Sequence, residues 1–273
     1  MTAIAHDPDH RRERPTTGLV ASTLTITRRA ALRYVRTPQL IVMATLQMSL
    51  FFLIYRYMFG GAIHAGSIPY VDYLVPGFIA TGVLFSGIGA AVATAEDLEQ
   101  GFADRLRSLP IPRSSVLAAR VLADTAILAL AAAVTVAIAF AVGFRLHASV
   151  VHGLAAFGLV IVFGFAFEWV FITLGLLAGN SQAAQGMGMI VFPFAFISSA
   201  YIPVSTMPGW LQVFAKHQPL TQMVDAVRAL TLGVHAQAVL GHSASYYLSG
   251  SLIWTTGILA AAAPIAVWRY RRG

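Results

Sequence analysis

The chain has no cysteine, and its 18 basic residues include a single lysine, Lys216. The absence of cysteine excludes disulfide scaffolds, thiolate metal sites and cysteine nucleophiles. A phosphate-binding P-loop needs a glycine-rich segment that ends in Lys followed by Ser or Thr, and Lys216 is followed by His217. The chain therefore has no P-loop, and any ATP hydrolysis that drives it must come from a separate polypeptide.

Charged residues are also scarce, because 11% of the 273 residues are charged and 58% are hydrophobic. A soluble domain carries roughly a quarter charged residues, so this composition cannot coat a water-exposed surface. The formal charge of +7 would suggest nucleic acid in a soluble protein, but basic residues at membrane edges have another use, and we expect no nucleic acid partner. We predict one membrane domain over residues 17–273, after a disordered tail over residues 1–16.

Six stretches are candidates for membrane spans, since a hydrocarbon core of roughly 30 Å needs about 20 apolar residues of helix. They are residues 40–59, 73–95, 116–144, 154–178, 183–201 and 248–268. The fifth is the weakest, being short, glycine-rich at Gly186 and Gly188, and interrupted by Pro193. The sequence predicts an all-α membrane protein with six transmembrane helices.

The basic residues lie mainly on one side of these spans. Fourteen of the 18 precede the first span, lie in or beside the connection between the second and third spans, or follow the sixth span. Positive residues are retained on the cytoplasmic side, so we expect both termini in the cytoplasm and a location in the inner or plasma membrane, in contact with its lipids.

Residues 17–37 have the pattern of an amphipathic helix. Apolar residues gather on one side, while Arg29, Arg33 and Arg36 gather on the other. A helix that lies flat in the cytoplasmic interface needs this distribution, with its arginines among the lipid phosphates. The alternative is a basic flank that only fixes topology, and we favour the interfacial helix.

The connection between the second and third spans carries a short apolar stripe. Leu98, Phe102 and Leu106 recur at i, i+4 and i+8 on an otherwise charged segment, which Pro110 and Pro112 then end. Such a stripe either contacts a partner surface or packs against the bilayer, and the spacing alone leaves both possibilities open.

Residues 202–241 are too polar to span a membrane and too apolar for a simple loop. Pro208 and Pro219 each predict the start of a short helix, and the second helix is expected to end before Gly233. The sequence predicts a pair of short helices between spans five and six.

Glu168 is the only acidic residue deep inside a predicted span, where an acidic charge costs about 2.5 to 3.5 kcal/mol on insertion scales. It could line a translocation path, bind a cationic group or carry a proton, or it could be a packing residue between helices. Gln47 and Asn180 are further candidates for the path, although such amides more often hydrogen-bond between helices. The eight histidines are scattered and predict no metal site.

An alternative function is a proton- or ion-coupled secondary transporter that uses Glu168. That class needs several ionisable residues inside the membrane and usually an internal repeat. The sequence shows one such acid and no repeat, so we favour a transporter driven by another subunit.

Three blocks of sequence point to a family. They are DRLRSLPI at residues 104–111 with RVLAD at 120–124, LLAGNSQAAQ at 176–185, and IPVSTMPGWL at 202–211 with HQPLT at 217–221. In their order and spacing they resemble ABC-2-type transporter permeases of the daunorubicin/doxorubicin-resistance (DrrB-like) class. The resemblance covers essentially residues 17–273 and gives no information about the substrate.

The resemblance implies a half-transporter of six helices, with an interfacial helix before the first and a re-entrant helical hairpin within residues 202–241, for which a surface cap is the alternative. It also implies a coupling helix at residues 99–109 that contacts the ATPase. The coupling residues would be Glu99, Gly101, Phe102, Asp104, Arg105, Leu106 and Arg107.

By the same resemblance, the chain would be the permease subunit of an ATP-binding-cassette exporter. It would pair with a second permease, as a homodimer or a heterodimer, and with two copies of a separate ABC ATPase. The chain itself would be no enzyme and would bind no cofactor, because ATP and Mg would be held by the ATPase. The exporter would move a hydrophobic or amphipathic substrate, drug-like or lipid, out of the cytoplasm by alternating access.

Overall fold

The computed structural model describes residues 38–61, 63, 68–101 and 113–272, and all its elements are helices. The long ones are α2 (Pro38–Phe59), α3 (Tyr70–Glu99), α5 (Arg113–Ala141), α6 (Val150–Ala178) and α12 (Ala244–Arg272). The short ones between α6 and α12 are α7 (Ser181–Gly188), α8 (Val191–Phe196), η1 (Val204–Thr206), α9 (Gly209–His217), α10 (Pro219–Leu232), η2 (Gly233–His235) and α11 (Ala236–Leu240). The predicted all-α fold class is confirmed for this part of the chain.

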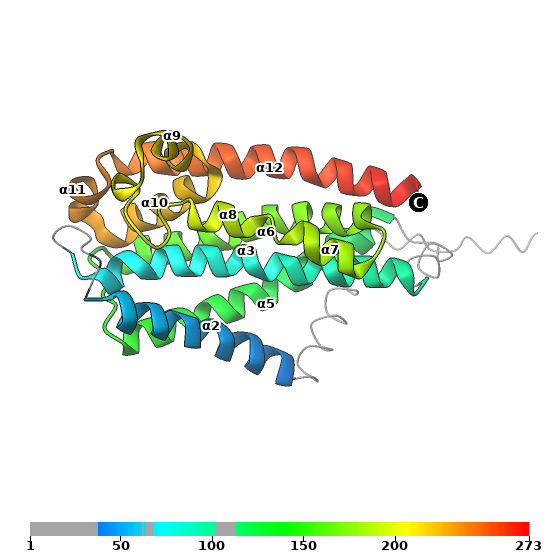
Figure 1. The fold of residues 1–273 in the computed structure, drawn as a ribbon, viewed down its shortest axis with the longest axis horizontal. Coiled ribbons are helices and arrows are strands. Elements are labelled where there is room, and N and C mark those ends of the chain that lie inside the picture. Colours follow the sequence, from blue (N-terminus) through cyan, green and yellow to red (C-terminus); the bar gives the residue numbers. More distant parts are fainter. Residues whose placement is uncertain (1–37, 62, 64–67, 102–112, 273) are drawn as a thin grey trace, which may run out of the picture.

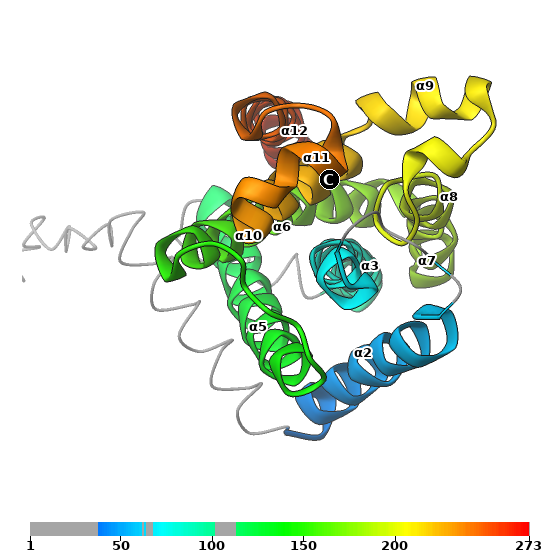
Figure 2. The same cartoon turned by 90° about the vertical axis from the view of Figure 1, so that its left-hand side faces the viewer.

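The long helices run side by side along the longest axis of the molecule (Figure 1). Figure 2 shows α3 in the middle, with α2, α5, α6 and α7 around it. We call the end of the bundle where α3, α6 and α12 finish and α5 begins the C-terminal end. At the other end, which we call the hairpin end, α3 and α12 begin and α9, α10 and α11 lie (Figure 1).

Four of the described helices are long and apolar enough to cross a membrane: α3, Val116–Ala141 of α5, α6 and Ala244–Arg271 of α12. Large apolar side chains cover much of their outer surface, and Val151 and Ile253 are each more than 70% exposed. Soluble monomers rarely expose contiguous apolar surface on this scale. A bilayer is the environment that covers such surface, so the described helices fit a membrane protein.

Five of the six predicted spans coincide with single long helices, α2, α3, α5, α6 and α12. The fifth predicted span, residues 183–201, is not one continuous helix, since α7 ends at Gly188 and α8 begins at Val191. Glycine weakens a helix interior, and Pro193 has no N–H to donate to the carbonyl four residues earlier. The break between α7 and α8 lies between Gly188 and Pro193, the residues that weaken the helix.

The two helices predicted in residues 202–241 are confirmed. Pro208 is the N-cap of α9, and Pro219 is the first residue of α10, which ends before Gly233. Every residue of α10 from Leu220 to Leu232 is buried, whereas α9 exposes Trp210, Val213 and Phe214. α10 therefore belongs to the core of the bundle and α9 to its surface.

Close packing against α3 is possible because of a glycine in its second turn. A Cβ placed on Gly77 would come within 1.9 Å of the backbone oxygen of Ala200, which lies in the segment between α8 and η1. Only glycine allows this approach of helix to backbone. The contact fixes residues 198–201 against the start of α3.

Candidate functional site

At the C-terminal end, an ion pair joins α3 to α5. Arg120 of α5 donates through Nη1 to Oδ2 of Asp97 in the last turn of α3, and its Nε lies 3.6 Å from Oδ2 of Asp124 one turn further along α5. The side chains of Arg120 and Asp97 are 23% and 41% exposed. An ion pair with this exposure contributes little net stability, so it can open at low cost.

Glu168 lies deeper in the bundle, on α6, and is 3% exposed. Its Oε2 atom is buried and accepts no hydrogen bond from any residue in the described part of the chain. Arg120 and Asp124 are the charged neighbours whose field acts on it. Glu168 is ten residues before the end of α6, which corresponds to about 15 Å along the helix. We call Asp97, Arg120, Asp124 and Glu168 the Arg120 cluster.

The Arg120 cluster carries one guanidinium and three carboxyl groups on three different helices. Arg120 pairs with Asp97 across the two helices and with Asp124 on its own helix. A displacement of the ends of α3 and α5 would therefore change the distance from Arg120 to Asp97 and leave its distance to Asp124 unchanged.

The predicted coupling residues begin where this cluster ends. Glu99 is exposed in the last turn of α3, and Gly101 has φ +63°, a left-handed conformation that ends the helix without strain. The other predicted coupling residues, Phe102, Asp104, Arg105, Leu106 and Arg107, lie outside the described residues. The Asp97–Arg120 ion pair thus joins α3 and α5, the two helices that flank residues 101–112 in the sequence.

The remaining predicted site residues are described only in part. Asn180 caps α7, where its side-chain oxygen accepts a hydrogen bond of 2.7 Å from the Ala183 amide. Gln47 belongs to α2, but its side chain is outside the described set, and Arg29, Arg33 and Arg36 lie outside the described residues. The roles of Asn180, Gln47 and the three arginines stay predictions.

The hairpin end contains a second buried charged group, centred on Arg228 of α10. The Arg228 guanidinium is fully buried: Nε and Nη2 donate to the Tyr73 carbonyl at 3.0 and 2.9 Å, and Nη2 also donates to the Ala200 carbonyl at 3.0 Å. It also lies 3.5 Å from the centre of the Tyr73 ring. These contacts tie α10 to α3 and to residues 198–201.

Asp225 completes this arrangement from the same face of α10. Its Oδ1 accepts hydrogen bonds of 2.8 Å from both Arg228 Nη1 and the Ser199 hydroxyl, while the Tyr73 hydroxyl donates to the Ser199 carbonyl at 3.1 Å. We call Tyr73, Ser199, Ala200, Asp225 and Arg228 the Arg228 network. Four of the five guanidinium N–H donors have partners in it.

A further hydrogen-bonded pair at the hairpin end links α3 to the connection between α5 and α6. The buried Asp72 binds His147 Nε2 at 2.7 Å through one oxygen and accepts from the Arg145 amide at 2.9 Å through the other. The amide of His147 donates to the Thr231 carbonyl of α10 at 2.9 Å. The start of α3 is thereby connected through Asp72 to residues 145–147, which in turn contact α10.

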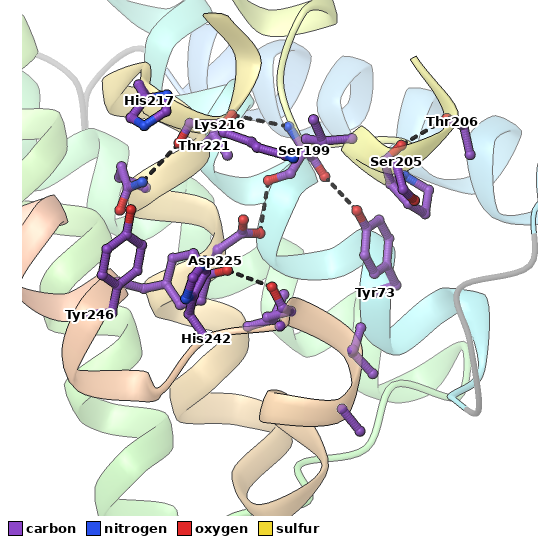
Figure 3. A pocket seen from close by; sticks show the side chains of 18 residues that line it. Tyr73, Ser199, Ser205, Thr206, Lys216, His217, Thr221, Asp225, His242 and Tyr246 are labelled. Atoms are coloured by element: carbon purple, nitrogen blue, oxygen red, sulfur yellow. Dashed lines mark hydrogen bonds between the residues drawn. The ribbon is translucent and has the colours of Figure 1, made fainter. Parts of the chain in front are cut away.

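A cavity of about 610 Å³ lies beside the Arg228 network. Figure 3 shows Lys216 and His217 on one side of it, His242 and Tyr246 on the other, and Asp225 between them. Among the described residues, no three His, Asp or Glu side chains are grouped as a metal site would need.

The sequence predicted neither the burial of Arg228 nor the charged neighbours of Glu168. In the structure Arg228 is fully buried, and Arg120 and Asp124 are the charged groups that act on Glu168. A usable signal was the helical spacing of opposite charges, i and i+3 for Asp225 and Arg228 and i and i+4 for Arg120 and Asp124.

Comparison with known proteins identifies related membrane subunits. The profile of the ABC-2 type transporter family matches residues 21–232. The "Daunorubicin resistance ABC transporter permease protein DrrB1" of Streptomyces coeruleorubidus is 29% identical over 254 residues, which covers 92% of this chain and 87% of that protein. The "Probable doxorubicin resistance ABC transporter permease protein DrrC" of two Mycobacterium tuberculosis strains is 26% identical over 255 residues, covering 93% of this chain and 89% of theirs.

Proposed function

Since the chain belongs to the ABC-2 type transporter family, in which it is a permease subunit without its own ATPase site, we propose that it exports hydrophobic or amphipathic compounds from the cytoplasm. The observation that carries this proposal is the match of the family profile over residues 21–232. The names of the relatives, which concern daunorubicin and doxorubicin resistance, support a drug-like substrate, and a lipid is the other amphipathic class.

The proposed topology has six crossings, with both termini in the cytoplasm of a plasma membrane protein. Support comes from the sequence, which puts 14 of the 18 basic residues on the predicted cytoplasmic side of the spans, and from α7 and α8, which follow one another along the bundle and together would form the fifth crossing (Figure 1). α9 and α10 would form a re-entrant hairpin. The burial of α10 supports this, because polar backbone at membrane depth must be covered by protein.

The proposed partners are a second permease, identical or related, and two copies of a separate ATPase that holds ATP and Mg. Residues 99–109 would contact the ATPase as a coupling helix, and residues 17–37 would lie in the cytoplasmic interface. A push on the coupling helix would move the adjoining ends of α3 and α5. The Asp97–Arg120 ion pair would then open, and the Arg120 cluster would pass the displacement to α6 through Glu168, as the permease halves alternate between inward and outward openings.

The test is ATP-dependent uptake of daunorubicin into inside-out vesicles that contain the chain together with its ATPase. We expect uptake to require both subunits and ATP. Phe102→Asp should abolish uptake while ATP hydrolysis continues, because it places a charge in the apolar stripe of the coupling segment. Ser245→Asp, an exposed position at the hairpin end, adds the same charge and should leave uptake unchanged.

Two results would contradict this function. One is uptake by the purified chain without the ATPase, driven by an ion gradient alone. The other is normal ATP-dependent uptake by correctly inserted Phe102→Asp protein, which would show that residues 99–109 do not transmit the push.

A further inference from the structure

The cavity at the hairpin end has the size of a ligand site, because pockets for small molecules enclose about 300 to 1,000 Å³. Its 610 Å³ lie between the end of α9, the buried face of α10 and the junction of α11 with α12 (Figure 3). The exporter function proposed above does not use it.

The depth of the cavity is set by the helices that begin beside it. Tyr73 lies in the first turn of α3 and Tyr246 in the first turn of α12, so the cavity is level with the ends of two spans. Tyrosines favour this level, where their rings meet the lipid headgroups. α9 borders the cavity and exposes an apolar stripe of Trp210, Val213 and Phe214, the pattern of a helix that lies along the acyl boundary.

One side of the cavity is suited to an anion. Lys216 and His217 stand at the end of α9, are both exposed, and line the cavity (Figure 3). No carboxylate in the described part of the chain forms an ion pair with Lys216. At the level of the headgroups, the anion that such an ammonium meets is a lipid phosphate.

The opposite side is suited to a cation. Asp225 engages Ser199 and Arg228 through Oδ1 alone, and within the described residues no donor reaches its Oδ2. The aromatic rings of Tyr246 and Tyr247 meet at 5.2 Å, and His242 lies 4.6 Å from Tyr246. A carboxylate oxygen beside aromatic faces is a favourable environment for an ammonium group.

We propose that this cavity binds the headgroup of an aminophospholipid, with the phosphate at Lys216 and His217 and the primary ammonium between Asp225 and Tyr246. The acyl chains would leave the cavity along the exposed apolar residues of α9. The proposal requires only that the chain lies in a bilayer, so it stands or fails independently of the exporter function.

Native mass spectrometry of the purified full-length chain with phosphatidylethanolamine and phosphatidylglycerol tests this site. We expect phosphatidylethanolamine to bind about tenfold more tightly, the effect of one additional charged hydrogen bond. Lys216→Gln should weaken both lipids, whereas Tyr246→Leu should weaken phosphatidylethanolamine alone. Both positions are exposed, so the variants should fold. Arg145→Gln, which removes a cation at the same end but outside the cavity, is the matched control and should bind as the unmodified chain does.

Three outcomes would overturn the proposal. Equal binding of the two lipids would show that the cavity has no ammonium subsite. Unchanged binding by Lys216→Gln would show that Lys216 does not form a phosphate subsite. Soluble glycerophosphoethanolamine that binds as tightly as the lipid would show that the source of the headgroup is not the membrane.

Discussion

Each end of the bundle has an arginine that pairs with acidic residues, but the two arginines differ in burial and in their hydrogen-bond partners. At the hairpin end, Arg228 is fully buried and has hydrogen-bond partners from α3, α10 and residues 198–201. At the C-terminal end, Arg120 is 23% exposed, one of its two ion pairs is 3.6 Å long, and Oε2 of the nearby Glu168 has no partner in the described structure.

This contrast suggests different roles for the two ends. A fully buried charge whose counter-charge and carbonyl partners come from several elements holds one arrangement of helices, because a displacement leaves a charge uncompensated. A partly exposed ion pair between two helices opens at low cost. We therefore interpret the Arg228 network as a fixed joint and the Arg120 cluster as the part that changes during transport.

The largest effect is expected from Arg228→Leu. It leaves the Asp225 carboxylate without its counter-charge and the Tyr73 and Ala200 carbonyls without their donor, and it should lower the free energy of unfolding by about 3 to 5 kcal/mol. Equilibrium unfolding in mixed micelles measures this. Arg145→Leu is the control, since the exposed Arg145 side chain donates only to nearby carbonyls, and it should change stability by less than about 1 kcal/mol. An equal loss of stability in the two variants would show that the buried Arg228 contributes no more to stability than the exposed Arg145.

A smaller loss is expected from Gly77→Ala. The new Cβ would meet the Ala200 oxygen at 1.9 Å and push residues 198–201 away from α3, which should cost about 1 to 3 kcal/mol. Gly89→Ala on the same helix meets nothing within 4 Å and should be neutral or slightly stabilising. The same unfolding assay compares the two. If both variants were neutral, the joint at the hairpin end would be less rigid than we infer.

The smallest effect is expected from Glu168→Gln. Removing a buried carboxylate that lacks a partner for Oε2 relieves an unfavourable burial, so stability should stay within about 1 kcal/mol or rise. The matching neutralisation at the other end, Asp225→Asn, takes the counter-charge from Arg228 and should destabilise strongly. A large loss for Glu168→Gln would show that the Arg120 cluster is as tightly satisfied as the Arg228 network.

The sequence was sufficient to predict seven of the described helices, because each of these has a local cause. Apolar runs define α2, α3, α5, α6 and α12, and prolines mark the starts of α9 and α10. The prediction of a continuous fifth span underestimated Gly188 and Pro193, whose effect on a helix depends on whether neighbouring helices support it.

The two clusters could not be predicted, because each joins residues that are distant in sequence. Asp97 and Arg120 are 23 residues apart and meet only when α3 and α5 pack together. Arg228 contacts Tyr73 across 155 residues, and its burial results from the packing of a helix too short to be recognised as a core element. The spacing of opposite charges within α5 and α10 indicates the ion pair inside each helix, but it does not indicate which residues of other helices join that pair.

The absence of cysteine from the chain allows the central claim to be tested directly. A cleavable bifunctional thiol reagent can link Leu98→Cys in the last turn of α3 to Val116→Cys in the first turn of α5, two partly buried positions that pack against one apolar cluster and leave the Arg120 cluster unchanged. ATP hydrolysis and daunorubicin uptake are both measured in the complex with the ATPase. We predict that the link stops uptake while hydrolysis continues, that reduction restores uptake, and that the same link between Asp72→Cys and His147→Cys at the hairpin end leaves uptake unchanged. Full uptake with α3 linked to α5 at Leu98 and Val116 would contradict the account.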